Sequence, residues 1–285
     1  MCHEFYKALE VKGYKPIKIL GYLCTLFLIP IGVVKTYTMM MICASVIPII
    51  IFIGMLISII SKLKYNIVDI SITLLGAIYT VFMVAFLAAT RAMPLGVFLL
   101  FYIIGGAWFS DIFAYLFGRF LGKHKFSNIS PKKSIEGCIA GLIGSVVFFV
   151  GYSAVLNNIN IAEFHEASNN IAIVNKIENE EFINEEEKTI EKAAQEKSLP
   201  TTDYEMQQIL KEKFYNNYLL LILLGLFVSI ISQIGDFAAS AIKRYADIKD
   251  FSHLMPGHGG MLDRFDSILF VAPIVYYTFY IMIHI

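Results

Sequence analysis

The sequence predicts an all-α, polytopic integral membrane protein with about seven transmembrane helices and a soluble acidic insert. Of the 285 residues, 57% are apolar and only 16% are charged, and the mean hydropathy is +0.67. Apolar runs long enough to span recur along the chain. A bilayer core takes about 20 residues of helix per crossing, whereas soluble domains are only about half apolar. A soluble helical fold is therefore the weaker alternative.

The apolar runs define the expected crossings, and the segments between them define the expected domains. We expect crossings at 17–34, 38–60, 67–90, 95–117, 135–156, 218–239 and 267–285. The corresponding domains are an amphipathic N-terminal segment (1–16), N-terminal helices (17–94), helices with a basic loop (95–156), an acidic solvated insert (157–217) and C-terminal helices (218–285). We expect no cleaved signal, because no small-residue cleavage site follows the first apolar run.

Lysine and arginine are concentrated in four segments. With the seven expected crossings, all four segments lie on the same side of the membrane. These segments are the N-terminus, the loop with Lys62 and Lys64, the loop 119–133, and the loop 243–264. Basic residues in short loops mark the cytoplasmic side. We therefore expect an integral membrane protein whose N-terminal segment and basic loops face the cytoplasm.

The acidic insert contrasts with the rest of the chain. Residues 157–217 hold 13 acidic and 6 basic side chains, so the remainder carries a net charge of +7. The insert lacks a run long enough to span and is rich in Glu, Lys and Asn. This composition favours a partly helical solvated spacer over a binding module.

Two carboxylates interrupt apolar runs. Asp236 follows the run from Leu219 to Ile234, and Asp111 lies within the run from Leu95 to Phe117. A charge at such depth costs about 3 kcal/mol on insertion scales, so it usually faces an aqueous cavity, a cation or a partner charge. Solvation at a helix end is the plainer alternative, and it has more weight for Asp111 than for Asp236.

If the helix after Leu219 continues through Arg244, several polar side chains share one face. Asp236, Ser240, Lys243 and Arg244 then fall at i, i+4, i+7 and i+8, spacings that align on a helix. A Lys-Arg pair alone is typical of a membrane anchor. The aligned carboxylate and hydroxyl favour a functional face instead.

A glycine-rich stretch follows this face. In Pro256-Gly257-His258-Gly259-Gly260, glycines allow backbone N–H groups to approach phosphate oxygens closely, and the next helix start contributes a positive dipole end. A tight turn entering a membrane helix is the alternative. His258 could donate a proton, contact phosphate or fix the turn.

Two further carboxylates begin the last helix. Asp263 and Asp266 are three residues apart and can point the same way. With Asp236 they predict a three-carboxylate cluster of hard oxygen ligands, the type that Mg²⁺ prefers when it also holds substrate phosphates.

The second basic loop carries five cations from Arg119 to Lys133, including Lys132. On one membrane face with the later loop, they would attract a nucleoside triphosphate and an anionic lipid head group alike. A lipid-facing anchor is the alternative for this loop. Ser134 near Gly137 also indicates a helix entry.

These residues resemble a known family. The pattern S-x-x-K-R-x-x-x-x-K-D-x-x-x-x-x-P-G-H-G-G-x-x-D-R-x-D, from Ser240 to Asp266, resembles the signature of phosphatidate cytidylyltransferases. The stretches 108–118, 122–124 and 129–137 resemble a cytoplasmic-loop motif of the same family, with Ser134 in place of the usual threonine. The resemblance covers about 67–156 and 218–285.

Two departures from the family pattern accompany the resemblance. The acidic insert is longer than the family leads us to expect. The segments Glu4–Lys7 and Lys12–Pro16 resemble a loop that normally follows the family's first membrane helices. The sequence is therefore expected to lack one or two N-terminal crossings or to begin at an internal methionine.

The resemblance implies transfer of the cytidylyl group of CTP to phosphatidate, giving CDP-diacylglycerol and pyrophosphate. It implies Mg²⁺, as one or two divalent ions with or without a monovalent cation, a lipid bilayer as surroundings, no nucleic-acid partner and a homodimer. The implied metal ligands are Asp236, Asp263 and Asp266, and the implied catalytic residues add Lys243 and His258. The implied substrate contacts are Ser240, Arg244, Asp250, Gly257, Gly259, Gly260, Arg264, Asp111, Lys132 and Lys133.

Three rival functions are weighed against this one. A related cytidylyltransferase acting on a polyprenol or archaeal lipid phosphate shares every motif, because sequence does not separate acyl from isoprenoid chains. A CDP-alcohol phosphotransferase is disfavoured, because its D-G-x-x-A-R pattern is absent. A transporter or channel would also place aspartates in the membrane, but it would not release pyrophosphate from CTP.

Overall fold

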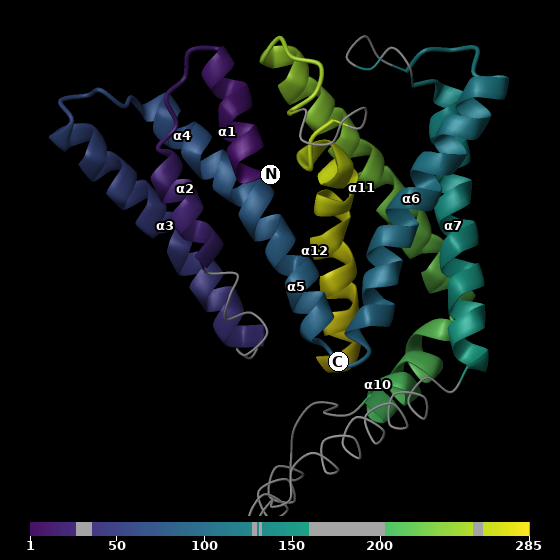
Figure 1. Ribbon diagram of the computed structural model, residues 1–285. Helices are drawn as coiled ribbons and strands as arrows, with labels where there is room; N and C mark the ends of the chain where they lie inside the picture. The colour runs from purple at the N-terminus through teal and green to yellow at the C-terminus, as the bar shows by residue number, and fades with distance from the viewer. Residues whose placement is uncertain (27–35, 127–129, 131–132, 160–202, 253–258, 285) are drawn as a thin grey trace, which may run out of the picture.

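The computed structural model is a bundle of helices (Figure 1). It describes residues 1–26, 36–126, 130, 133–159, 203–252 and 259–284. Within these ranges there is an isolated β-bridge between Lys125 and Ser134 but no strand. The predicted all-α fold is confirmed for the described residues.

Five long apolar helical segments are suited to crossing a membrane. They are Ile67–Ala92, made of α4 (Ile67–Gly76), η2 (Ala77–Phe82) and α5 (Met83–Ala92), then α6 (Gly96–Leu121), α7 (Ile135–Asn158), α11 (Tyr218–Tyr245) and α12 (Leu262–His284). Each has at least 22 residues of suitable length and composition, which at about 1.5 Å per residue spans a bilayer core of about 30 Å. Five predicted crossings therefore coincide with helices.

The remaining two predicted crossings fall on the N-terminal part of the chain. Helix α2 (Lys18–Thr25) begins the predicted span 17–34, but residues 27–35 lie outside the described residues. Helix α3 (Thr36–Ile60) covers the predicted span 38–60. The count of seven crossings stays a prediction.

The basic segments lie at one end of the bundle. In Figure 1 the turn after α1 (Cys2–Val11), the α3–α4 connection, the start of α7 and the chain between α11 and α12 are all at the upper end, whereas the α5–α6 turn and α10 (Asp203–Leu210) are at the lower end. The sequence placed the four basic segments on one side for reasons of charge alone. The helix arrangement agrees with that grouping.

Glycines allow α6 and α7 to pack backbone against backbone. A Cβ added at Gly137 would lie 2.7 Å from the carbonyl oxygen of Ala114, and one added at Gly144 would lie 2.7 Å from that of Phe109. Small residues at such spacings permit close helix contact in membranes, where apolar burial does not by itself drive association. The start of α7 is fixed by Ser134, whose hydroxyl accepts the N–H of Gly137 at 3.1 Å, which confirms the predicted helix entry.

The N-terminal segment is part of the core. Predicted as an amphipathic segment over 1–16, it forms α1, whose Phe5 and Tyr6 are fully buried. The Tyr6 hydroxyl donates to the carbonyl of Thr73 at 2.7 Å, which ties α1 to α4. Amphipathicity here reflects packing against the membrane helices and not only a surface position.

The predicted solvated insert, 157–217, is described only at its two ends. Its middle, 160–202, lies outside the described residues. Its last part forms α10 and η3 (Lys211–Tyr215), where Met206, Leu210 and Phe214 are 0% exposed. The prediction of a solvated segment is wrong for this part, because these three apolar side chains recur every four residues and form one helix face.

Candidate active site

The helix that carries the predicted functional face is continuous. Helix α11 starts after Asn217, whose side chain accepts the N–H of Leu220 at 3.1 Å, and runs to Tyr245. Asp236, Ser240 and Lys243 therefore do lie on one face of a single helix, as predicted.

A glycine brings this face to the start of the last helix. A Cβ on Gly235 would lie 2.8 Å from the carbonyl oxygen of Asp266 and 3.1 Å from Cα of Ser267, closer than side chains normally approach backbone. Helices α11 and α12 thus cross in direct contact at Gly235. The crossing places the turn with Asp236 beside the turn with Asp266.

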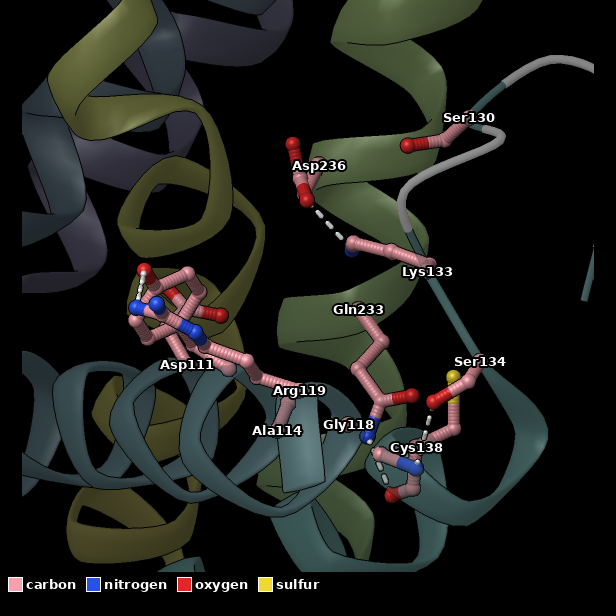
Figure 2. Close-up of a pocket in the computed structure, with 12 residues that line it drawn as sticks. Asp111, Ala114, Gly118, Arg119, Ser130, Lys133, Ser134, Cys138, Gln233 and Asp236 are labelled. Carbon is pink, nitrogen blue, oxygen red and sulfur yellow. Dashed lines mark hydrogen bonds and ion pairs between the residues drawn. The ribbon is translucent and has the colours of Figure 1, made fainter. Parts of the chain in front are cut away.

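A cavity of about 510 Å³ opens between α6, α7, α11 and the loop before α7 (Figure 2). This volume lies within the usual range for ligand pockets of about 300–1,000 Å³. Three predicted site residues, Asp111, Lys133 and Asp236, are among its lining residues. The full lining is Asp111, Ala114, Tyr115, Gly118, Arg119, Ser130, Lys133, Ser134, Gly137, Cys138, Gln233 and Asp236.

An ion pair joins the basic loop to α11 across the cavity. Lys133 Nζ contacts Asp236 Oδ2, and Figure 2 shows the lysine pointing from the loop toward the aspartate. The ammonium group also lies 4.3 Å from the ring centroid of Phe237, a distance at which a cation is attracted to the ring face. The two charged side chains keep 21% and 30% of their surface exposed, so both stay accessible to a ligand in the cavity.

Sequence reasoning missed several lining residues. Gln233 donates its amide to the carbonyl of Cys138 at 3.0 Å and to Ser229 Oγ at 3.2 Å, which connects α11 to α7. Its position three residues before Asp236 on an otherwise apolar helix was the available signal. Arg119, from the last turn of α6, was expected only as one of the cations of the basic loop, and it adds a second cation to the lining.

Asp263 is held by three donors outside this cavity. Its Oδ1 accepts Lys243 Nζ at 2.7 Å, and its Oδ2 accepts the N–H groups of Phe251 at 2.8 Å and Gly260 at 3.0 Å. The charged groups of Lys243 and Asp263 are only 14% and 9% exposed. This carboxylate therefore connects the end of α11 and the residues Phe251 and Gly260 to the start of α12.

The last helix begins five residues before the predicted start at 267, at Leu262. The predicted crossing followed the apolar run alone, whereas the prediction that Asp263 and Asp266 begin the last helix is confirmed. Carboxylates are favourable at a helix N-terminus, because backbone N–H groups there lack partners in the helix. The polar turn belongs to the helix for that reason.

Three carboxylates lie near the α11–α12 crossing. Asp111 and Asp236 line the cavity, and the backbone of Asp266 lies against Gly235 at the crossing. Asp266 is 7% exposed, and Ser267 Oγ donates to Asp111 Oδ2 at 3.3 Å. Carboxylates at membrane depth are costly without a nearby cation. Lys133 supplies one at Asp236, and a further cation would offset the charge of the other two carboxylates.

Among the described residues, no group of three His, Cys, Asp or Glu side chains is close enough to hold a metal ion alone. The metal set of Asp236, Asp263 and Asp266 therefore stays a prediction. Its members differ in availability. Both Asp236 and Asp263 pair with a lysine, but Asp263 is 9% exposed, whereas Asp236 is 30% exposed and faces the cavity.

The other predicted site residues are distributed around this centre. Ser240 and Asp250 are half-buried, and Arg244 and Arg264 are exposed. Gly259 has a φ of +78°, a backbone conformation in which glycine is favoured. Lys132, Gly257 and His258 lie outside the described residues.

The sequence model of the Cytidylyltransferase family matches residues 1–282. The chain belongs to this family. The match spans both the cavity and the chain between α11 and α12.

Several curated relatives carry the name phosphatidate cytidylyltransferase. The protein of Staphylococcus haemolyticus is 29% identical over 225 residues, which is 76% of this chain and 62% of that relative. The Bacillus subtilis protein is 30% identical over 183 residues, 64% of this chain and 47% of its own length. The Staphylococcus aureus (strain COL) protein is 29% identical over 79% of this chain and 64% of its own length. The chain thus spans less than two thirds of the relatives it matches.

Proposed function

We propose that this protein transfers the cytidylyl group of CTP to phosphatidate, producing CDP-diacylglycerol for phospholipid synthesis and releasing pyrophosphate. The cavity between α6, α7 and α11 carries this proposal, because it sets Lys133 and Arg119 beside Asp111 and Asp236 at the basic end of a membrane bundle. Cations and carboxylates together suit an anionic substrate that arrives with a metal ion. The names of the curated relatives support the same substrates.

In the proposed reaction a phosphate oxygen of phosphatidate attacks the α-phosphorus of CTP. A new P–O bond forms as the bond to the bridging oxygen between the α- and β-phosphorus breaks, and pyrophosphate carries away the electron pair. The attacking phosphate is already an anion at neutral pH, so no protein nucleophile is required. The protein's main task is to hold two anions in line and to offset their charge.

The residues divide this task by location. Lys133 and Arg119 would contact the triphosphate within the cavity. Lys243, Arg244 and Ser240, farther along α11, would contact the phosphate groups at the lipid side, with Arg264 and Asp250 nearby in the signature. Gly257, His258, Gly259 and Gly260 would wrap pyrophosphate or the lipid head group, and Lys132 would assist Lys133.

The carboxylates fit Mg²⁺. This ion is usually held by one or two protein carboxylates together with substrate phosphates and water, so the absence of a three-ligand set among the described residues does not conflict with it. Asp236 would be the first ligand, with Asp266 or Asp111 next. Asp263 could join only if its ion pair with Lys243 opened. The ion would offset charge on the phosphates as they react.

The topology is part of the proposal. We propose seven crossings, with α2 and α3 forming the first two, and an active site at the cytoplasmic face, because the basic segments share one end of the bundle (Figure 1). A homodimer is expected from the family resemblance alone. Labelling of single cysteines at position 64 and at position 91 from either side of sealed vesicles would test the orientation, and equal access from one side would overturn it.

Turnover with defined lipids tests the chemistry. Purified protein in vesicles, with CTP and Mg²⁺, should form CDP-diacylglycerol and an equal amount of pyrophosphate when phosphatidate is present. A polyprenyl phosphate serves as the competing acceptor. If only the polyprenyl phosphate is converted, the lipid substrate is a polyprenyl phosphate and not phosphatidate. If CTP releases no pyrophosphate with either lipid, the proposed function is wrong.

A further inference from the structure

Glu4 of α1 reaches the start of the last membrane helix, 258 residues away in the sequence. Its Oε2 accepts the N–H of Leu262 at 2.8 Å, and its Oε1 accepts the N–H of Met261 at 3.0 Å and the hydroxyl of Ser252 at 2.5 Å. The side chain is 6% exposed. It is a buried carboxylate from another helix that caps the N-terminus of α12.

Glu4 and Asp263 each hydrogen-bond to both ends of the segment between Phe251 and Leu262. Asp263 joins the N–H of Phe251 to the N–H of Gly260, and Glu4 joins Ser252 to Met261 and Leu262. Each carboxylate therefore contacts both ends of the segment from Phe251 to Leu262, which we call the signature loop. The two carboxylates together fix both ends of this loop.

The contact favours glycine at position 260. A Cβ on Gly260 would lie 2.8 Å from Glu4 Oε1 and 2.8 Å from Ser252 Oγ, so a side chain there would displace these two hydrogen-bonded groups. Phosphate binding is thus not the only reason for the second glycine of Gly259-Gly260. It also admits the carboxylate of Glu4.

The ionised form of Glu4 is the one that these contacts favour. Burial raises its pKa, but the hydrogen bonds from Ser252 and from the Leu262 and Met261 N–H groups, together with the N-terminal ammonium group of Met1 at 3.5 Å from Oε2, outweigh burial, and the net pKa is lowered. Hydrogen bonds to a charged acceptor are about twice as strong as neutral ones. A carboxylate with two N–H donors at a helix N-terminus combines this strength with the favourable end of the helix dipole.

The helix that carries Glu4 is itself firmly placed. Phe5 and Tyr6, the next two residues, are fully buried, and Tyr6 is hydrogen-bonded to the backbone of α4. A Cβ on Gly76 of α4 would lie 2.3 Å from the Tyr6 ring, so α1 and α4 are in close contact. Movement of the signature loop relative to α4 would therefore require Glu4 to release it.

We propose that Glu4 is a positioning residue, which holds the loop end at Gly260–Leu262 so that Asp263 and Lys243 are correctly placed for the transfer. The proposal rests on the proposed function for its catalytic consequence. It assigns the N-terminal helix a role in the reaction although α1 contributes nothing to the lining of the cavity.

The test compares Glu4→Gln with Glu10→Gln. Glu10 is on the same helix and pairs with Lys18 at the surface, so the control makes the same chemical change away from the loop. Loss of one buried charged hydrogen-bond acceptor should lower kcat about 10- to 100-fold, whereas the KM for CTP should change less than about 3-fold because the cavity has no contact with Glu4. Glu10→Gln should leave both constants unchanged.

A second measurement does not depend on turnover. Hydrogen exchange at the amides of Met261 and Leu262 should be faster in Glu4→Gln than in Glu10→Gln and in the unmodified protein. Unchanged exchange together with unchanged kcat would overturn the proposal. Faster exchange in a protein that makes no CDP-diacylglycerol in any form would overturn the proposed function and leave the loop contact established.

A third variant separates positioning from simple loss of folding. Glu4→Asp keeps the charge but shortens the side chain by one methylene, so it should fold, retain CTP affinity and show an intermediate kcat. If Glu4→Gln and Glu4→Asp instead lose CTP binding and thermal stability together with kcat, Glu4 is only a structural residue and the proposal is wrong.

Discussion

The cavity and the signature loop use the same kinds of residue in opposite ways. In the cavity, the Lys133–Asp236 pair keeps 21% and 30% of its side-chain surface exposed, and Arg119 and Asp111 line open space. At the loop, the Lys243–Asp263 pair is 14% and 9% exposed, and two backbone N–H groups also bind the aspartate. We therefore place the proposed nucleotide site in the open cavity, with the closely held loop ends beside it.

The largest loss is expected from breaking the open pair. Lys133→Met would remove the cation that meets Asp236 across the cavity and would leave that carboxylate without its partner. Removal of one preorganised electrostatic group typically lowers kcat about 100- to 1,000-fold, and we also expect a higher KM for CTP. Steady-state kinetics over a range of CTP concentrations measure both effects.

Lys133→Arg is the control for this substitution. It keeps the charge, so it should retain more activity than the methionine variant. Equal activity in all three forms would show that the cavity is not the nucleotide site.

A smaller loss of kcat is expected from disturbing the loop ends that Glu4 and Asp263 hold. Gly260→Ala would place a Cβ 2.8 Å from Glu4 Oε1 and Ser252 Oγ, which should displace the loop and lower kcat about 10-fold with little change in the KM for CTP. Gly151→Ala is the matched control, because a Cβ there meets nothing within 4 Å. If the two variants have the same kcat, the loop is not held as described.

Gln233→Leu should lower the free energy of unfolding more than substitution of the Lys133–Asp236 pair does. The amide joins α11 to the carbonyl of Cys138 on α7, and its loss would leave that carbonyl and Ser229 Oγ with one donor fewer. We expect a loss of about 1–3 kcal/mol in unfolding free energy, seen as a lower Tm in detergent. An unchanged Tm would mean that the α7–α11 contact does not depend on this bond.

The smallest effect is the pH dependence of the Glu4 contact. Since hydrogen bonding lowers the pKa of Glu4 below its usual value, the stabilisation is fully present above the unfolded pKa near 4.5 and is lost as the pH falls through the lower folded value. The difference in Tm between the unmodified protein and Glu4→Gln should thus be constant from about pH 6 to 8 and shrink only in acid. A difference that grows in acid would contradict this account.

The sequence predicted the helices better than their contacts. Apolar runs placed five spans within a few residues, because a bilayer demands long apolar helices whatever their neighbours are. The same criterion left out the first turn of α12, where carboxylates accept backbone N–H groups and Leu262 is buried. It also missed the burial of Met206 and Phe214, since their runs are short.

The sequence predicted which residues form the site but not which lysine pairs with which aspartate. Sequence spacing placed Asp236 and Lys243 on one helix face, which the structure confirms. It could not show that Lys133 pairs with Asp236, whereas Asp263 pairs with Lys243, because both pairings join segments far apart in the chain. In the sequence, Glu4 is notable only as part of Glu4–Lys7, which resembles a loop of the family, and nothing in its neighbours indicates a contact with Leu262.

The fate of labelled phosphorus in the Asp236→Asn variant tests the central claim most directly. With purified protein, phosphatidate and Mg²⁺, label at the α-phosphorus of CTP should appear in the lipid and label at the γ-phosphorus should appear only in pyrophosphate. Asp236→Asn should reduce both about 100-fold or more, whereas Asp247→Asn, at an exposed pair with Lys12, should reduce neither. Full lipid labelling by Asp236→Asn would contradict the assignment of this cavity as the site of transfer.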